Sequence, residues 1–155
     1  MKKWLIVLII IILALLEVTL LDYIRVFGTK PDLLIISVFV LSFYAGFKWA
    51  LPLAILAGAL KDAFGSYPFG LNTLLFSVWS ILLIKLSKKV SIDSDLIRAI
   101  LVFIILVFNN IIARMILLFS GNSIPLGIFL RVTFLESLYT ASVLPLVLKF
   151  IKLAV

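Results

Sequence analysis

Long apolar runs separated by short polar turns make up almost the whole chain. Six runs can be distinguished, at residues 4–21, 33–45, 49–64, 72–86, 94–119 and 125–151. A helix that crosses a bilayer needs roughly 20 mainly apolar residues, because each residue adds about 1.5 Å. The pattern therefore predicts six membrane-spanning helices, of which the second and third are short and would be tilted or drawn in.

Turn-forming residues support these boundaries. Pro31 and Asp32 suit the start of the second helix, where a proline and an acidic residue are favoured. Residues 65–70 contain Gly, Ser and Pro and predict a turn, and Ser94 can cap the fifth helix. The basic start of the first run is also typical of a signal peptide. No small-x-small cleavage site follows that run, so we expect a retained helix.

The composition agrees with a membrane protein. Hydrophobic residues make up 65% of the 155 residues and charged residues only 14%, whereas soluble domains have about a quarter charged residues. This excludes a soluble enzyme, a coiled coil and a disordered tail. Because the chain has no His and no Cys, it offers no imidazole base, thiolate or disulfide. We expect an all-α integral membrane protein with a single transmembrane domain over residues 1–155 and no cofactor or metal.

The basic residues predict the orientation. With six spans, nine of them fall on the side of the termini: Lys2, Lys3, Lys48, Lys85, Lys88, Lys89, Arg98, Lys149 and Lys152. Only Arg25 and Lys30 fall in a loop on the opposite side. Since cytoplasmic loops carry an excess of Lys and Arg, both termini are expected in the cytoplasm. The same rule accounts for the net charge of +7 without a nucleic-acid partner.

Apart from the charges near the cytoplasmic helix ends, six charged residues lie within the predicted helices: Glu17, Lys61, Asp62, Arg114, Arg131 and Glu136. Charges at this depth are costly and usually face one another inside the bundle. Their positions place most of them in the outer half of the bilayer, with Glu136 nearer the middle. Two interpretations follow. They form either a polar cavity that receives a ligand or partner from outside, or a self-satisfied layer of ion pairs with the arginines reaching to the interface.

A stripe of small residues marks the third helix. Ala50, Ala54 and Gly58 recur at every fourth position, and Asp62 continues the row. Such a stripe lets another helix approach closely. For Asp62 itself we expect hydrogen bonds either from Arg114 or Arg131, or from the backbone N–H groups that begin the fourth helix.

The most distinctive stretch covers residues 58–73 and reads GALKDAFGSYPFGLNT. It resembles the signature of the bacterial rod shape-determining protein MreD, in which a Gly is followed by an Asp, a small-residue and Pro turn, and Gly-Leu. The sequence PDLL at residues 31–34 also resembles that family's entry to its second helix. We take as candidate partner or pocket residues Gly58, Asp62, Gly65, Pro68, Gly70, Arg114, Arg131 and Glu136.

The resemblance implies a role rather than a reaction. MreD-like proteins lie in the bacterial inner membrane beside the bitopic protein MreC. They belong to the machinery that elongates the peptidoglycan wall, together with MreB filaments, a glycosyltransferase and a transpeptidase. Their fold is similar to the six-helix substrate-capture subunit of energy-coupling-factor vitamin transporters.

Two other functions deserve comparison. A vitamin-capture subunit would share the fold, but it usually carries an Ala-xxx-Ala docking pair on its first helix, where this chain has only Ala14. An intramembrane peptidase of the signal peptidase II kind would need a second intramembrane Asp beside Asp62, and Glu136 is the only other nearby acid. The sequence therefore favours a non-enzymatic scaffold, with substrate capture as the alternative.

Overall fold

The computed structural model describes residues 3–25, 28–65, 68–91, 93–121 and 125–154. These residues form six α-helices and no strand. The helices are α1 (Lys3–Val18), α2 (Leu33–Tyr44), α3 (Phe47–Phe64), α4 (Leu71–Lys89), α5 (Asp95–Phe119) and α6 (Leu126–Ala154). The all-helical prediction is confirmed.

The helix boundaries differ from the prediction at a few ends. The connection between α2 and α3 is shorter than expected, because α3 already begins at Phe47 and the turn depends on Gly46, whose φ is 73°. Helix α4 continues to Lys89, three residues beyond the predicted end at residue 86. The prediction that the Ser94 side chain caps the fifth helix is wrong. Ser94 stands before α5 without a capping hydrogen bond, and Asp95 supplies the negative charge in the first turn.

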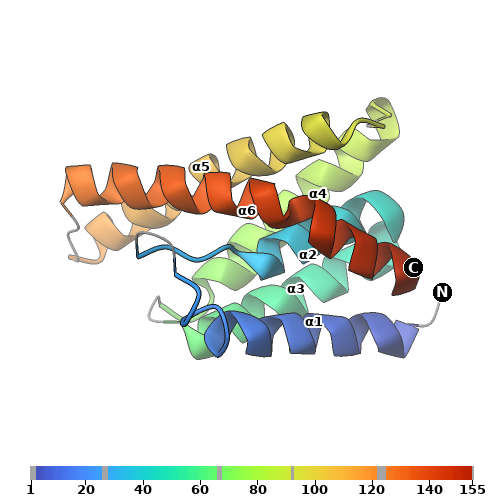
Figure 1. Cartoon of the computed structure of the whole chain (residues 1–155), viewed down its shortest axis with the longest axis horizontal. Coiled ribbons are helices and arrows are strands. Elements are labelled where there is room, and N and C mark those ends of the chain that lie inside the picture. The colour runs from blue at the N-terminus through green and yellow to red at the C-terminus, as the bar shows by residue number, and fades with distance from the viewer. Residues whose placement is uncertain (1–2, 26–27, 66–67, 92, 122–124, 155) are drawn as a thin grey trace.

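Helix α2 lies at the centre of the bundle. Every residue from Leu33 to Ser42 is buried, and the helix contacts α1, α3, α4, α5 and α6. A helix that is apolar on all sides is one that is covered on all sides. Figure 1 shows α2 and α3 between α1 on one side and the α5–α6 pair on the other. Helix α2 is therefore both the shortest of the described helices and the one at the centre of the bundle.

Both termini lie at the same end of the bundle, as Figure 1 shows, and the C-terminal ends of α1, α3 and α5 lie at the opposite end. Three helical segments are long and apolar enough to cross a membrane: Leu71–Lys89, Asp95–Phe119 and Leu126–Phe150. Trp4–Val18 and Leu33–Tyr44 are shorter apolar helices. The described residues thus include helices with the length and composition of membrane spans.

Candidate functional site

Asp62 joins the end of α3 to the beginning of α4. Its carboxylate accepts hydrogen bonds at 3.0 Å from the backbone N–H groups of Gly70, Asn72 and Thr73. The Asn72 amide donates at 3.0 Å and the Thr73 hydroxyl at 2.7 Å. The first N–H groups of a helix have no partner within it, and one buried carboxylate here satisfies several of them. The predicted contact with the backbone of the fourth helix is confirmed.

Arginine takes no part in that contact. None of the five donors to Asp62 is Arg114 or Arg131, so the alternative pairing is wrong. The physical reason is local. The carboxylate lies 4% exposed against the amides of α4, and these nearby donors occupy its oxygens.

Gly58 brings the backbones of α3 and α4 into contact. A Cβ atom on Gly58 would lie 2.5 Å from Thr73 Cα and 2.8 Å from Asn72 O. These distances are shorter than any van der Waals contact, so only glycine fits. The close approach predicted from the small-residue stripe is confirmed, and Ala50 and Ala54 of that stripe are 1% and 0% exposed.

The other residues of the family-like stretch shape the same turn. Gly70 has a φ of 99°, in the region that favours glycine, directly before α4. Gly65 is the exposed residue that ends α3. Pro68 is exposed, and its carbonyl accepts a hydrogen bond from the Leu71 N–H at 3.2 Å. Together they turn the chain so that Asp62 faces the start of α4.

A second polar group connects α1, α2 and α3. The Lys61 ammonium group pairs with Asp32 and lies 4.0 Å from Glu17. Both acids also bind the start of α2: Asp32 accepts from the Ile35 N–H at 3.0 Å and Glu17 from the Leu34 N–H at 3.2 Å. This group is an ion-paired layer inside the bundle.

Asp32 also links α2 to α6. Its backbone N–H donates to the Thr140 hydroxyl at 3.0 Å, and both residues are 2% exposed or less. From the sequence, Asp32 is expected only at a helix start, and its pairing with Lys61 is not predicted. One signal could have found it. Asp32 precedes the Gly46 turn by 14 residues and Lys61 follows it by 15, so two antiparallel neighbouring helices would place them at the same level.

The remaining intramembrane charges lie on α5 and α6. Glu136 accepts a hydrogen bond from the Asn110 amide at 3.1 Å. The Arg114 guanidinium lies over the Phe129 ring, 4.5 Å from its centroid, which is a favourable contact for a cation. Arg131 is on the exposed face of α6. The expectation that all six charges converge holds only in part. Glu17, Lys61 and Glu136 line one cavity, whereas Asp62, Arg114 and Arg131 do not line it.

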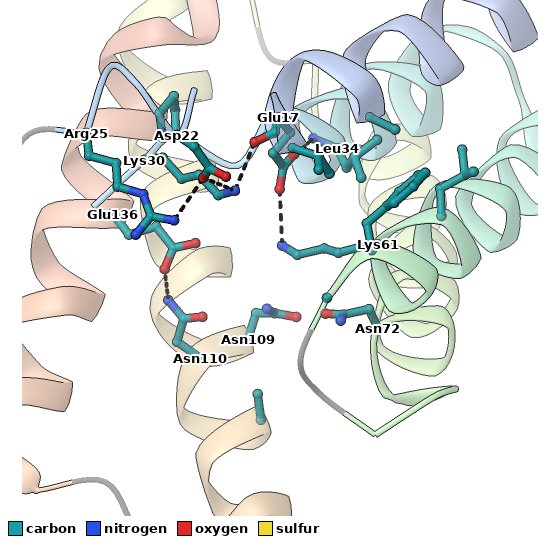
Figure 2. Close-up of a pocket in the computed structure, with 17 residues that line it drawn as sticks. Glu17, Asp22, Arg25, Lys30, Leu34, Lys61, Asn72, Asn109, Asn110 and Glu136 are labelled. Carbon is teal, nitrogen blue, oxygen red and sulfur yellow. Dashed lines mark hydrogen bonds and ion pairs between the residues drawn. The ribbon is translucent and has the colours of Figure 1, made fainter. Parts of the chain in front are cut away.

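A polar cavity of about 510 Å³ lies between these groups (Figure 2). Its lining includes the carboxylates of Glu17 and Glu136, the ammonium group of Lys61 and the amides of Asn72, Asn109 and Asn110. Exposed Arg25 and Asp22 form its rim with Lys30. Of the candidate residues, Gly65 and Glu136 line this cavity, and Arg114 and Glu136 line a smaller one of about 200 Å³ between α5 and α6. Arg131 lines neither.

The rim is held together by ion pairs outside the helices. Asp22 accepts hydrogen bonds from Arg25 at 2.8 Å and from Lys30 at 3.0 Å. These contacts, with Arg25 first, hold the pKa of Asp22 below its usual range. The carboxyl is therefore ionised at neutral pH, and the rim contains two cations for one anion. Its contribution to the folded state is present above the ordinary pKa of an aspartate and is lost as the pH falls below that value.

These contacts limit the chemistry of the site. The Asp62 carboxylate has five donors and is held as an acceptor, which suits a structural role better than proton transfer. In the described part of the chain, no group of three or more acidic side chains is placed to hold a metal ion. No family model, curated protein or solved structure matches the chain.

Proposed function

We propose that this chain is a non-enzymatic membrane scaffold of the MreD kind, with six spans and both termini in the cytoplasm. One observation carries the proposal. Within the stretch 58–73, which carries the resemblance, Gly58 allows the close approach of α3 and α4, and Asp62 binds the start of α4. Residues that fix the contact between two helices suit a protein whose role is to present a surface to partners.

In this proposal the protein lies in the bacterial inner membrane and binds an MreC-like bitopic protein. It would contribute to cell shape with the wall-elongation glycosyltransferase, the transpeptidase and MreB filaments, directly or through MreC. Figure 1 supports this arrangement, because the C-terminal end of α3 and the N-terminal end of α4 lie at the end away from both termini. That end would face the periplasm, where a bitopic partner has most of its mass.

The orientation can be tested by cysteine labelling, since the chain has no native Cys. Tyr23 follows the C-terminal end of α1 and Phe69 precedes α4, and the two residues are 90% and 79% exposed. Tyr23→Cys and Phe69→Cys should react with an impermeant thiol reagent in spheroplasts, because the Lys and Arg bias places them outside. Ser91→Cys, exposed at the other end, should react only after the membrane is opened. Labelling of Ser91→Cys in intact spheroplasts would overturn the six-span orientation.

Partner binding can be tested at Asp62. Asp62→Asn keeps the size and removes the charge, so the charge-assisted bonds to Gly70 and Thr73 weaken by about 1–3 kcal/mol. We expect the turn before α4 to shift, and the recovery of a co-expressed MreC-like protein per folded molecule to fall more than the amount of folded protein. Asp62→Ala should lower both the partner recovery and the amount of folded protein, since several N–H groups lose their acceptor.

The measurement is the amount of partner that co-purifies in mild detergent, divided by the monodisperse fraction of this chain. Asp95→Asn serves as the matched control, because Asp95 is also next to a helix start but is exposed at the end near the termini. If Asp62→Asn left recovery per folded molecule at the wild-type level, Asp62 would be a packing residue only.

The cavity favours a second candidate, the substrate-capture subunit of an energy-coupling-factor transporter. Such a subunit needs a pocket at its outer end, and the 510 Å³ cavity is lined by residues near the C-terminal ends of α1 and α3 and by residues in the middle of α5 and α6. The same purification separates the two functions. Co-elution of an ATP-driven transport module in place of an MreC-like protein would favour substrate capture.

A further inference from the structure

The cavity has an uneven distribution of charge. Three carboxylates, those of Glu17, Asp32 and Glu136, lie on or directly behind its inner wall with one ammonium group, that of Lys61. The rim has the opposite balance, with Arg25 and Lys30 on either side of Asp22. The inner wall is therefore rich in acidic side chains and the rim in basic ones.

Among the acidic residues at the inner wall, Glu136 has the fewest partners. It accepts one hydrogen bond, from the Asn110 amide, and no Lys or Arg within the described ranges forms an ion pair with it. Figure 2 shows its carboxylate at the cavity, with one oxygen bonded to Asn110. The second oxygen can accept a hydrogen bond from a donor that enters the cavity.

The amides beside it also present acceptors. The Asn72 amide donates a hydrogen bond to Asp62, and the Asn110 amide donates one to Glu136. These bonds fix the orientation of each amide and leave its carbonyl oxygen as an acceptor. Asn109 is oriented the other way, because its oxygen accepts from the Trp79 indole at 3.1 Å. Two amide oxygens and a carboxylate around one space suit a ligand that donates several hydrogen bonds, as an ammonium group does.

We propose that this cavity binds a small zwitterion, with its ammonium group at Glu136 and its anionic group at Arg25 and Lys30. The volume of about 510 Å³ exceeds the need of a bare ion and accommodates a molecule of amino-acid size or somewhat larger. Arg25 uses one donor on Asp22, and Lys30 uses two, on Asp22 and the Glu17 carbonyl. Both have further donors for a carboxylate or phosphate.

This site is separate from the scaffold role, since Asp62 and Gly58 do not line the cavity. The ligand has two possible sources with the same chemistry: a soluble zwitterion, or the ethanolamine phosphate headgroup of a lipid in the outer leaflet. The probes are phosphoethanolamine and β-alanine, with ethylamine and ethyl phosphate as the matched halves.

Binding is measured by calorimetry on the full chain in detergent. We expect at least one zwitterion to bind saturably and about tenfold more tightly than either half, because both ends of the cavity contribute. Glu136→Gln should weaken zwitterion and ethylamine binding by about tenfold or more. Arg25→Gln should weaken zwitterion binding while leaving ethylamine unaffected. Asp95→Asn, at the other end of the bundle, should have no effect.

Nanodiscs then distinguish the sources. If phosphatidylethanolamine discs reduce binding of the soluble zwitterion relative to phosphatidylglycerol discs, the headgroup is the ligand; equal binding in both indicates a soluble one. Absence of saturable zwitterion binding in detergent and of any difference between the discs would overturn the proposal. If the Glu136→Gln variant folds and binds the zwitterion as the wild type does, the proposal is also overturned. If that variant does not fold, unchanged zwitterion binding by Arg25→Gln overturns it instead. Partner recovery measured on the same preparations reports on the scaffold role separately.

Discussion

Gly58→Leu is expected to abolish the folded protein. The new side chain would start from a Cβ atom 2.5 Å from Thr73 Cα and 2.8 Å from Thr73 N, and backbone cannot rotate aside as a side chain does. Overpacking of cores typically costs about 1–3 kcal/mol and sometimes more. Here α3 and α4 must separate, and that also breaks the bonds between Asp62 and Thr73. We therefore expect a loss above about 3 kcal/mol.

Gly58→Ala tests the same contact with a single methyl group. It should lower the midpoint of unfolding in an SDS titration by an amount equivalent to about 1–3 kcal/mol, because the helices must shift to admit the Cβ atom. The measurement is the fraction of folded protein in mixed micelles, followed by circular dichroism and gel filtration.

Gly127→Ala is the matched control. Gly127 is also within a helix, but a Cβ atom there meets no atom within 4 Å. The change should be neutral or stabilise the chain by up to about 1 kcal/mol, since alanine favours helix more than glycine does. If Gly58→Ala behaved like Gly127→Ala, the close contact between α3 and α4 would be wrong.

The sequence predicted the structure best at positions where the residue type, in its local pattern, has a single common structural role. A glycine in a row of small residues indicates a close helix contact, and Gly58 makes it. An aspartate between that glycine and a glycine-rich turn can reach the next helix start, and Asp62 does so. The helix ends were also predictable to within a few residues, because apolar runs and turn residues depend on neighbours in the sequence.

The charge pairs were less predictable, because they depend on which helices are neighbours. Because Asp32 was interpreted only as a helix start, no partner was predicted for Lys61. In the structure Asp32 both accepts a hydrogen bond from the start of α2 and pairs with Lys61. Arg114 was expected to meet an acid, but it lies over the aromatic ring of Phe129 on the adjacent helix. Depth along a helix can be estimated from the sequence, whereas the direction that a side chain faces follows from packing.

Lys61→Met is expected to have the largest effect among the charged residues. Lys61 is the cation between Asp32 and Glu17, which are 2% and 7% exposed. Removing it leaves two buried carboxylates facing each other, and breaking a buried pair in this way costs about 3–5 kcal/mol. Both acids also bind the start of α2, so the central helix should loosen with them. We expect most of the folded protein to be lost.

A double variant separates the charge from the packing. Asp32→Asn keeps an oxygen that can accept from Ile35, and it removes one of the two negative charges that Lys61 neutralises. In the Asp32→Asn background, Lys61→Met should therefore be less harmful than alone, with a coupling of about 0.5–3 kcal/mol. Lys88→Met is the matched control, since Lys88 is exposed at the end of α4 and should tolerate the change. The readout is again the SDS midpoint of each variant. Effects of the two substitutions that simply add would mean that Lys61 is not energetically coupled to Asp32 and that their ion pair contributes nothing to stability.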